Sequence, residues 1–180
     1  MNLAKIEAKL ADITKRLSEF DGQVAKIGWF ESAKYEDGTP VAYVASIQEY
    51  GAPAAAIPPR PFFIPTIEEK KEEWSNSVAK GAKAVIAGRR SATQVLEAVG
   101  LKAAGDVRYT ISQVRSPPLS KITLLLRKWR REGRKITGKT VGEAADAVAA
   151  NADVSGVPSQ PLNDTGYMIT TLTSVVGADE

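Results

Sequence analysis

Two short motifs are the places in this sequence where residue types and spacing suggest chemistry. Gly133-Arg-Lys-Ile-Thr-Gly138-Lys139-Thr140 has the spacing of a phosphate-binding loop, whose backbone amides and lysine hold nucleotide phosphates. Asp164-Thr165-Gly166 is the tripeptide of aspartic proteases, which cleave with two carboxylates that share a proton. Each motif works only in a particular structural setting, so the neighbouring residues decide what it can do.

The neighbouring residues argue against both activities. A phosphate-binding loop follows a buried parallel strand, yet the segment before Gly133, Arg127 to Glu132, is almost entirely charged. Only fourteen residues follow Gly166, too few for the strands of a protease. Asp164-Thr165-Gly166 therefore predicts a turn or a helix cap. We expect neither nucleotide hydrolysis nor proteolysis.

Composition narrows the possible chemistry further. The 180 residues include no cysteine and no histidine, which excludes disulfides, thiol nucleophiles, zinc sites built from these residues and the commonest general base. Carboxylate or lysine chemistry and oxygen-bound magnesium remain open. We expect a protein that is not an enzyme, with no catalytic residue, no metal and no cofactor.

Length and hydropathy predict one domain with an appendage, made in the cytosol. The chain is 43% hydrophobic, enough for one ordinary core. No apolar run approaches the roughly 20 residues that cross a bilayer, and the N-terminus lacks the apolar core of a secretory signal. We therefore expect no contact with a membrane.

Positive charge is concentrated in one segment. Arg115 to Lys139 contains nine Lys or Arg residues and one acid, Glu132, whereas the rest of the chain contains fifteen against twenty. Such a block is typical of a solvated or protein-contacting face, and it is also what nucleic-acid binding requires. Trp129 within it could stack on a base. The candidate contact residues are Arg127, Lys128, Arg130 and Arg131.

The first twenty residues predict an amphipathic helix that ends at Asp21-Gly22. We expect this helix to pack on the sheet of its own chain; an intersubunit coiled coil is the alternative. The residues of its apolar stripe are spaced by three or four: Leu3, Ile6, Leu10, Ile13, Leu17 and Phe20.

A strand and a short helix are predicted next. Gln23 to Phe30 alternates as a strand does. Thr39 fits the N-cap, Pro40 the first helical position and Gly51 the C-terminal cap of a helix from Val41 to Tyr50. Both ends of this helix are therefore marked in the sequence.

The following segments alternate between breaks and helices. Five prolines make residues 52–65 an ordered loop or an edge. A capping box at Thr66 predicts a helix that runs to Gly88, and one at Ser91 predicts a helix that runs towards Val114. Gly100 and Gly105 weaken the prediction of the second helix, and its end, Val107 to Val114, would also serve as a strand.

The last third is predicted to contain a helix, an appendage and a strand. Ser120 caps a helix from Lys121 to Glu132. An alanine-rich helix near Val141 to Ala150 lies in the appendage, residues 134–160. Tyr167 to Val176 is rich in β-branched residues and predicts a strand.

Three blocks of the sequence resemble the tail completion, or head-tail joining (neck), proteins of long-tailed bacteriophages. The blocks are Asp37 to Ala45 running on to Gln48 to Gly51 and Ile57 to Phe63; Pro117-Pro118-Leu119 followed by Thr123; and Pro161 to Gly166 with a hydrophobic segment behind it. Each block is short, but their order and spacing are fairly specific. The resemblance covers roughly residues 24–126 and 161–176.

The resemblance implies an α+β fold with a small antiparallel sheet packed with helices, to which the periodicity adds a long N-terminal helix and a helical insertion. Residues 1–133 and 161–180 would form one neck or tail-completion domain, with 134–160 inserted or appended. The implied function is that of a virion structural protein: a ring of six copies that joins tail to head, located in the virion and, before assembly, in the host cytoplasm.

The resemblance also implies partners and an interface. The partners would be further copies of the chain and the connector, neck, tail tube or tail terminator proteins, with DNA possible in the channel. The proline-bounded segment, Ile57 to Pro65, has two possible roles. It docks on a neighbouring subunit, with Arg60 donating to a carboxylate of that subunit, or it folds back onto the sheet of its own chain. The interface candidates are Ile57, Pro58, Pro59, Arg60, Pro61, Phe62 and Phe63. The alternative function is a nucleic-acid-binding module acting through residues 115–139.

Overall fold

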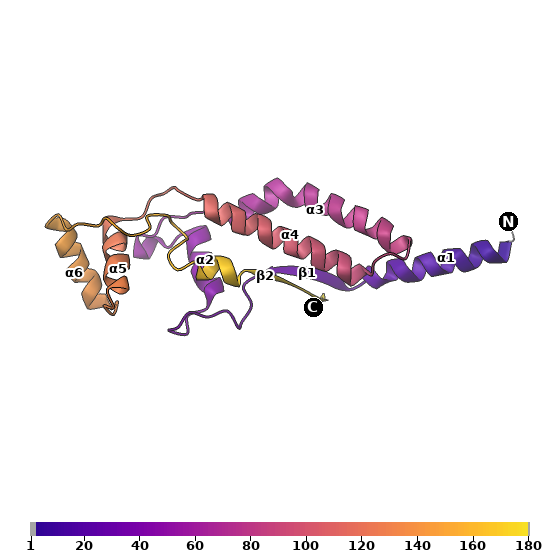
Figure 1. Cartoon of the computed structure of the whole chain (residues 1–180), viewed down its shortest axis with the longest axis horizontal. Coiled ribbons are helices and arrows are strands. Elements are labelled where there is room, and N and C mark those ends of the chain that lie inside the picture. Colours follow the sequence, from indigo (N-terminus) through magenta and orange to yellow (C-terminus); the bar gives the residue numbers. More distant parts are fainter. Residues whose placement is uncertain (1–2, 180) are drawn as a thin grey trace.

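Two long antiparallel helices, α3 (Phe63–Ile86) and α4 (Ala92–Gln113), form the axis of the molecule (Figure 1). The other elements lie along them or at their ends (Figure 1). The computed structural model describes residues 3–179. In chain order the elements are α1 (Leu3–Leu17), the 3-10 helix η1 (Ser18–Phe20), β1 (Gln23–Gly28), α2 (Val41–Tyr50), the 3-10 helix η2 (Pro53–Ala55), α3 (Phe63–Ile86), α4 (Ala92–Gln113), α5 (Lys121–Arg131), α6 (Gly138–Ala149), α7 (Tyr167–Thr171) and β2 (Thr173–Ala178).

The predicted α+β class is confirmed, with a long N-terminal helix and a small antiparallel sheet. The sheet consists of β1 and β2, paired antiparallel from Gln23↔Ala178 to Gly28↔Thr173. One face of the sheet lies against α4. A Cβ on Gly100 would lie 2.9 Å from the Cβ of Ser174, so this glycine allows the helix and the sheet to approach closely.

The core lies where α2, the start of α3, the second half of α4 and α7 meet. Trp29 packs edge-on against Phe62, and its indole N–H donates to the carbonyl of Met168 at 2.8 Å. This contact ties the chain following β1 to α7. The buried members of the cluster are Val41, Ala45, Phe62, Ala104, Val107, Ile111, Met168 and Leu172.

Several predicted boundaries agree with the structure. α2 has the predicted bounds, and Gly51 ends it with φ of 78°. The capping box of Ser91 and Gln94 opens α4, which is helical to Gln113; the strand alternative for its end is wrong because Val107 and Ile111 pack into the core from one helical face. Ser120 caps α5 as predicted.

Other predicted details are wrong for identifiable reasons. Pro40, not Thr39, is the N-cap of α2, because Pro40 has extended backbone angles and its carbonyl accepts the hydrogen bond from the Val44 amide. The capping box at Thr66 does not form, since α3 already begins at Phe63. Tyr167 to Thr171 is helical because Gly166, with φ of 76°, starts a short helix that buries Met168; only the following residues are a strand.

The prediction that the N-terminal helix packs on its own sheet is also wrong. α1 extends from the body beyond the connection between α3 and α4 and none of its residues is buried (Figure 1). Its last turns lie beside the end of α3, where the Arg16 guanidinium covers Gly88. Further along its apolar stripe, Leu3 and Leu10 are exposed and Ile6 is half-buried.

α5 and α6 pack against each other at the opposite end of the molecule (Figure 1). Thr137 caps α6 through a reciprocal pair of bonds with Thr140. The contact between the two helices lies across the predicted boundary at residue 133, and that boundary remains a prediction. Among the described residues, no helix combines the length and apolar composition needed to cross a bilayer.

Candidate interaction surfaces

The last turn of α2 organises a junction of buried charge. The Glu49 carboxylate accepts hydrogen bonds from the backbone N–H groups of Phe62, Phe63 and Ile64, at 2.8, 2.9 and 3.0 Å. These amides lie at the start of α3, where a helix has unpaired donors and a positive dipole end. A carboxylate from another helix thus caps α3, and no local motif in the sequence indicates it.

Arg60 completes this junction from the other side. Its side chain is only 5% exposed. Nε donates to the carbonyl of Pro117 at 2.8 Å, Nη2 to that of Pro118 at 3.2 Å, and Nη1 to Gln48 Oε1 at 3.2 Å. Burial lowers the pKa of Arg60. Its donors are therefore directed within the chain, and not towards a neighbour as one of the two predicted alternatives requires.

The part of the proline-bounded segment from Ile57 to Phe63 contains both buried and exposed residues. Arg60 and Phe62 are buried, Ile57 and Phe63 are half-buried, and Pro58, Pro59 and Pro61 are exposed. A Cβ on Gly51 would lie 2.9 Å from the carbonyl oxygen of Ile57, so the segment folds back closely over the end of α2. Only its prolines and parts of Ile57 and Phe63 remain available to a partner.

The arginines of α5 face the Asp164 carboxylate. Arg130 forms an ion pair with it, and nitrogens of Arg127 and Arg131 lie 3.6 and 3.8 Å from its Oδ1. The Arg127 Nη1 also donates to the carbonyl oxygens of Pro158 and Gln160, at 2.8 and 3.0 Å. Burial, followed by repulsion from Arg130, Arg131 and Arg60, lowers the pKa of Arg127 to about 10. This leaves it charged at neutral pH.

Lys128 and Arg134 also have partners in the chain. Lys128 Nζ lies 3.0 Å from Asp153 Oδ2, and the Arg134 guanidinium lies 4.0 Å from the ring centroid of Trp129. Arg134 therefore covers one face of Trp129, the residue predicted to be able to stack on a base. Arg127, Lys128, Arg130 and Arg131 are brought together, but each is engaged by the segment from Asp153 to Asp164.

The phosphate-loop motif lies between two helices. Gly133 follows α5, and Thr137 and Thr140 form the reciprocal cap of α6. The Lys139 side chain is exposed and its Nζ is 4.0 Å from Glu143 Oε1. A helix precedes the motif where a nucleotide-binding loop has a buried strand.

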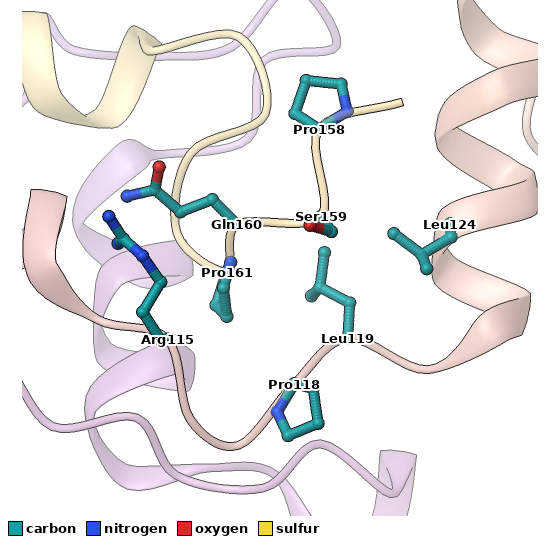
Figure 2. A pocket seen from close by; sticks show the side chains of 8 residues that line it. All are labelled: Arg115, Pro118, Leu119, Leu124, Pro158, Ser159, Gln160 and Pro161. Carbon is teal, nitrogen blue, oxygen red and sulfur yellow. The ribbon is translucent and has the colours of Figure 1, made fainter. Parts of the chain in front are cut away.

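A cavity of about 520 Å³ separates the junction from the α5–α6 pair (Figure 2). The loop after α4 supplies Pro118 and Leu119, and Leu124 of α5 closes another side. The remaining lining residues are Arg115, Pro158, Ser159, Gln160 and Pro161. The lining carries one guanidinium, one amide and one hydroxyl side chain and no carboxylate, which suits packing or peptide contact better than acid–base chemistry.

A second hollow of about 200 Å³ lies beside the buried Glu49 carboxylate. Its lining is mainly apolar and includes Trp29, Ala42, Ser46, Tyr50, Phe63 and Ile64. Tyr50 and Ile64 are exposed. We call this hollow the α2–α3 groove.

The chain matches no model of a protein family, no curated protein and no solved structure.

Proposed function

We propose that this chain is a structural subunit of a tailed bacteriophage particle, a neck or tail completion protein that assembles into a ring joining tail to head. The proposal starts from the resemblance of three sequence blocks to such proteins. Its mechanism is passive: subunits bind one another and adjoining particle proteins, and no bond is made or broken.

One observation carries the proposal: the blocks that resemble this family meet in the fold. Arg60 of the first block bonds to the carbonyls of Pro117 and Pro118 of the second. Pro161 of the third block is fully buried and lines the same cavity as Pro118. Residues far apart in sequence therefore form one structural unit, as expected if the blocks define a common fold and are not chance matches.

The surface supports assembly more than solitary function. Leu3 is 70% and Leu10 58% exposed on a helix that extends from the body. Exposed apolar stripes of this kind mark sites of protein–protein contact. The basic segment supports the nucleic-acid alternative less well, because its candidate residues are engaged by Asp153 and Asp164.

Native mass spectrometry and light scattering over a wide concentration range test the proposal. The expected result is a closed oligomer of defined copy number that appears as a ring by negative-stain electron microscopy. A chain that stays monomeric at high concentration, alone and with candidate connector and tail proteins, would contradict it. Turnover of a substrate by the purified chain would contradict it as well.

A further inference from the structure

The uncovered stripe of α1 needs a partner for physical reasons. α1 has 15 residues, and helices shorter than about 12–15 residues are marginal in water unless an apolar face is packed. Only its last turns lie beside α3, while Leu3 and Leu10 are exposed and Ile6 is half-buried. Leu3, Ile6 and Leu10 have the spacing with which a helix presents anchors to a groove.

The α2–α3 groove has the complementary character. Trp29, Ala42 and Phe63 line it, and the exposed Tyr50 and Ile64 extend the apolar surface beside them. Ile67, one turn beyond Ile64 on α3, is also exposed. The groove thus continues into an apolar strip along the first turns of α3.

α1 cannot reach this groove in its own chain. The groove lies at the first residues of α3, whereas α1 is held at the other end of that helix, where Arg16 covers Gly88. α3 has 24 residues and is therefore about 36 Å long. α1, about 22 Å long, points away from the groove (Figure 1). Any α1 in the groove must come from another copy.

Charge favours the same pairing. The part of α1 that would dock, residues 3–10, contains Lys5 and Lys9 against Glu7, a net charge of +1. Residues 63–72 of α3 contain Glu68, Glu69 and Glu72 against Lys70 and Lys71, a net charge of −1, and the next residue, Glu73, is paired with Lys102 of α4. Opposite potentials guide association and disfavour the wrong partner. Two copies of α1 facing each other would carry like net charge.

We propose that α1 of one subunit docks through Leu3, Ile6 and Leu10 into the α2–α3 groove of the next subunit. Because donor and acceptor lie at opposite ends of α3, the contact is head-to-tail, and such contacts close into rings when the rotation between subunits allows it. This inference rests on the proposed ring assembly and identifies the surfaces that make it.

Mixing two defective variants tests the direction of the contact. Leu3→Asp with Leu10→Asp removes the donor, and Ala42→Arg with Ser46→Arg fills the acceptor at exposed positions. Each variant should be monomeric with unchanged circular dichroism, whereas an equimolar mixture should form dimers and nothing larger, because one intact donor and one intact acceptor remain. Leu101→Asp, a control at a leucine 59% exposed on α4, should assemble normally.

The same experiment separates failure of this inference from failure of the proposed function. A wild-type chain that never assembles overturns the ring itself. A wild-type ring that survives both double variants overturns only the docking proposal. Loss of assembly in the α1 variant alone, with no dimer on mixing, indicates that copies of α1 pair with each other or that another protein covers them, and also overturns it.

The absence of cysteine makes a direct check possible. Leu10→Cys and Ser46→Cys in one chain should form disulfide-linked chains of several subunits on mild oxidation, each joined through positions 10 and 46 in peptide mapping. Crosslinks solely between two copies of position 10 would contradict the proposal.

Discussion

Helices α1 and α4 both carry an apolar stripe, but the stripe is buried on α4 and not on α1. On α4 the stripe is buried, with Val107 and Ile111 almost inaccessible to solvent. On α1 no residue is buried, and Leu3 and Leu10 are largely exposed. Periodicity therefore identifies which face of a helix is apolar, but it does not identify which surface covers that face.

A second contrast reinforces this point. At the start of α3, the charged residues Glu49 and Arg60 are buried, while on α1 leucines are exposed. The charges are tolerated inside because each has several hydrogen-bond partners. Burial at the start of α3 is possible because the polar groups are satisfied, whereas on α1 no element within residues 3–179 covers Leu3 and Leu10.

The largest expected difference lies between Ile111→Ala and Leu10→Ala. Truncating the fully buried Ile111 should lower the free energy of unfolding by about 2–5 kcal/mol. Truncating the exposed Leu10 should change it by less than about 0.5 kcal/mol in the monomer. Denaturant unfolding below the assembly concentration measures both. Similar losses in the two variants would show that α1 packs on its own chain.

Replacing the carboxylate that caps α3 should have the next largest effect. Glu49→Gln keeps one acceptor oxygen but removes the charge, leaving N–H groups of Phe62 to Ile64 poorly satisfied. We expect a loss of about 1–3 kcal/mol and faster hydrogen exchange at these amides. Glu69→Gln, at an exposed ion pair with Lys70, serves as the matched control and should be nearly neutral. Equal effects would contradict the capping role of Glu49.

Arg60→Lys tests the geometry of the junction while keeping its charge. An ammonium group cannot reproduce the planar fork that bonds two carbonyls and Gln48, so we expect a loss of about 1–2 kcal/mol. Arg90→Lys, at an exposed position, is the control. If Arg60→Lys left the free energy of unfolding unchanged, the hydrogen bonds of Arg60 within the chain would contribute little, and the predicted contact between Arg60 and a neighbouring subunit would remain open.

The smallest effect concerns the Asp153 carboxylate beside α5. Hydrogen bonds from the Ser155 amide and hydroxyl, and the contact with Lys128, lower its pKa to about 2. A lowered folded pKa means that this stabilisation is present above a pH of about 4, the ordinary aspartate pKa, and is lost as pH falls through about 2. NMR titration of the carboxyl carbon measures this. An unshifted pKa would show that the Ser155 hydrogen bonds and the Lys128 contact are both absent in solution.

The sequence predicted elements well where their signals are local. Pro40 and Gly51 delimited α2, and Ser91 with Gln94 marked the start of α4. It failed where a distant residue decides the outcome. α3 begins before Thr66 because Glu49, thirteen or more positions away, caps its first amides. Tyr167 to Thr171 has strand propensity, yet Met168 is buried in a helix.

The candidate surfaces divide in the same way. The stripe of α1 was visible in the spacing of its leucines, and only its setting was mistaken. Arg60 donates to the backbone carbonyls of residues 117 and 118. Every residue type has a backbone carbonyl, so these hydrogen bonds cannot be predicted from the residue types. Asp164 was predicted to cap or turn the chain; its role as counterion to the α5 arginines depends on the fold bringing them together.

The pairing of β1 with β2 has a consequence for how the molecule is made. Gln23 pairs with Ala178 and Gly28 with Thr173, so residues 29–172 are synthesised between the two strands. Contacts that distant in sequence form slowly, because a long loop must close first. During synthesis, β1 cannot pair with β2, and the Trp29 indole N–H cannot donate to the Met168 carbonyl, until the residues near the end of this sequence have been added. The β1 edge and the Trp29 indole therefore gain their partners only after α7 and β2 have been synthesised.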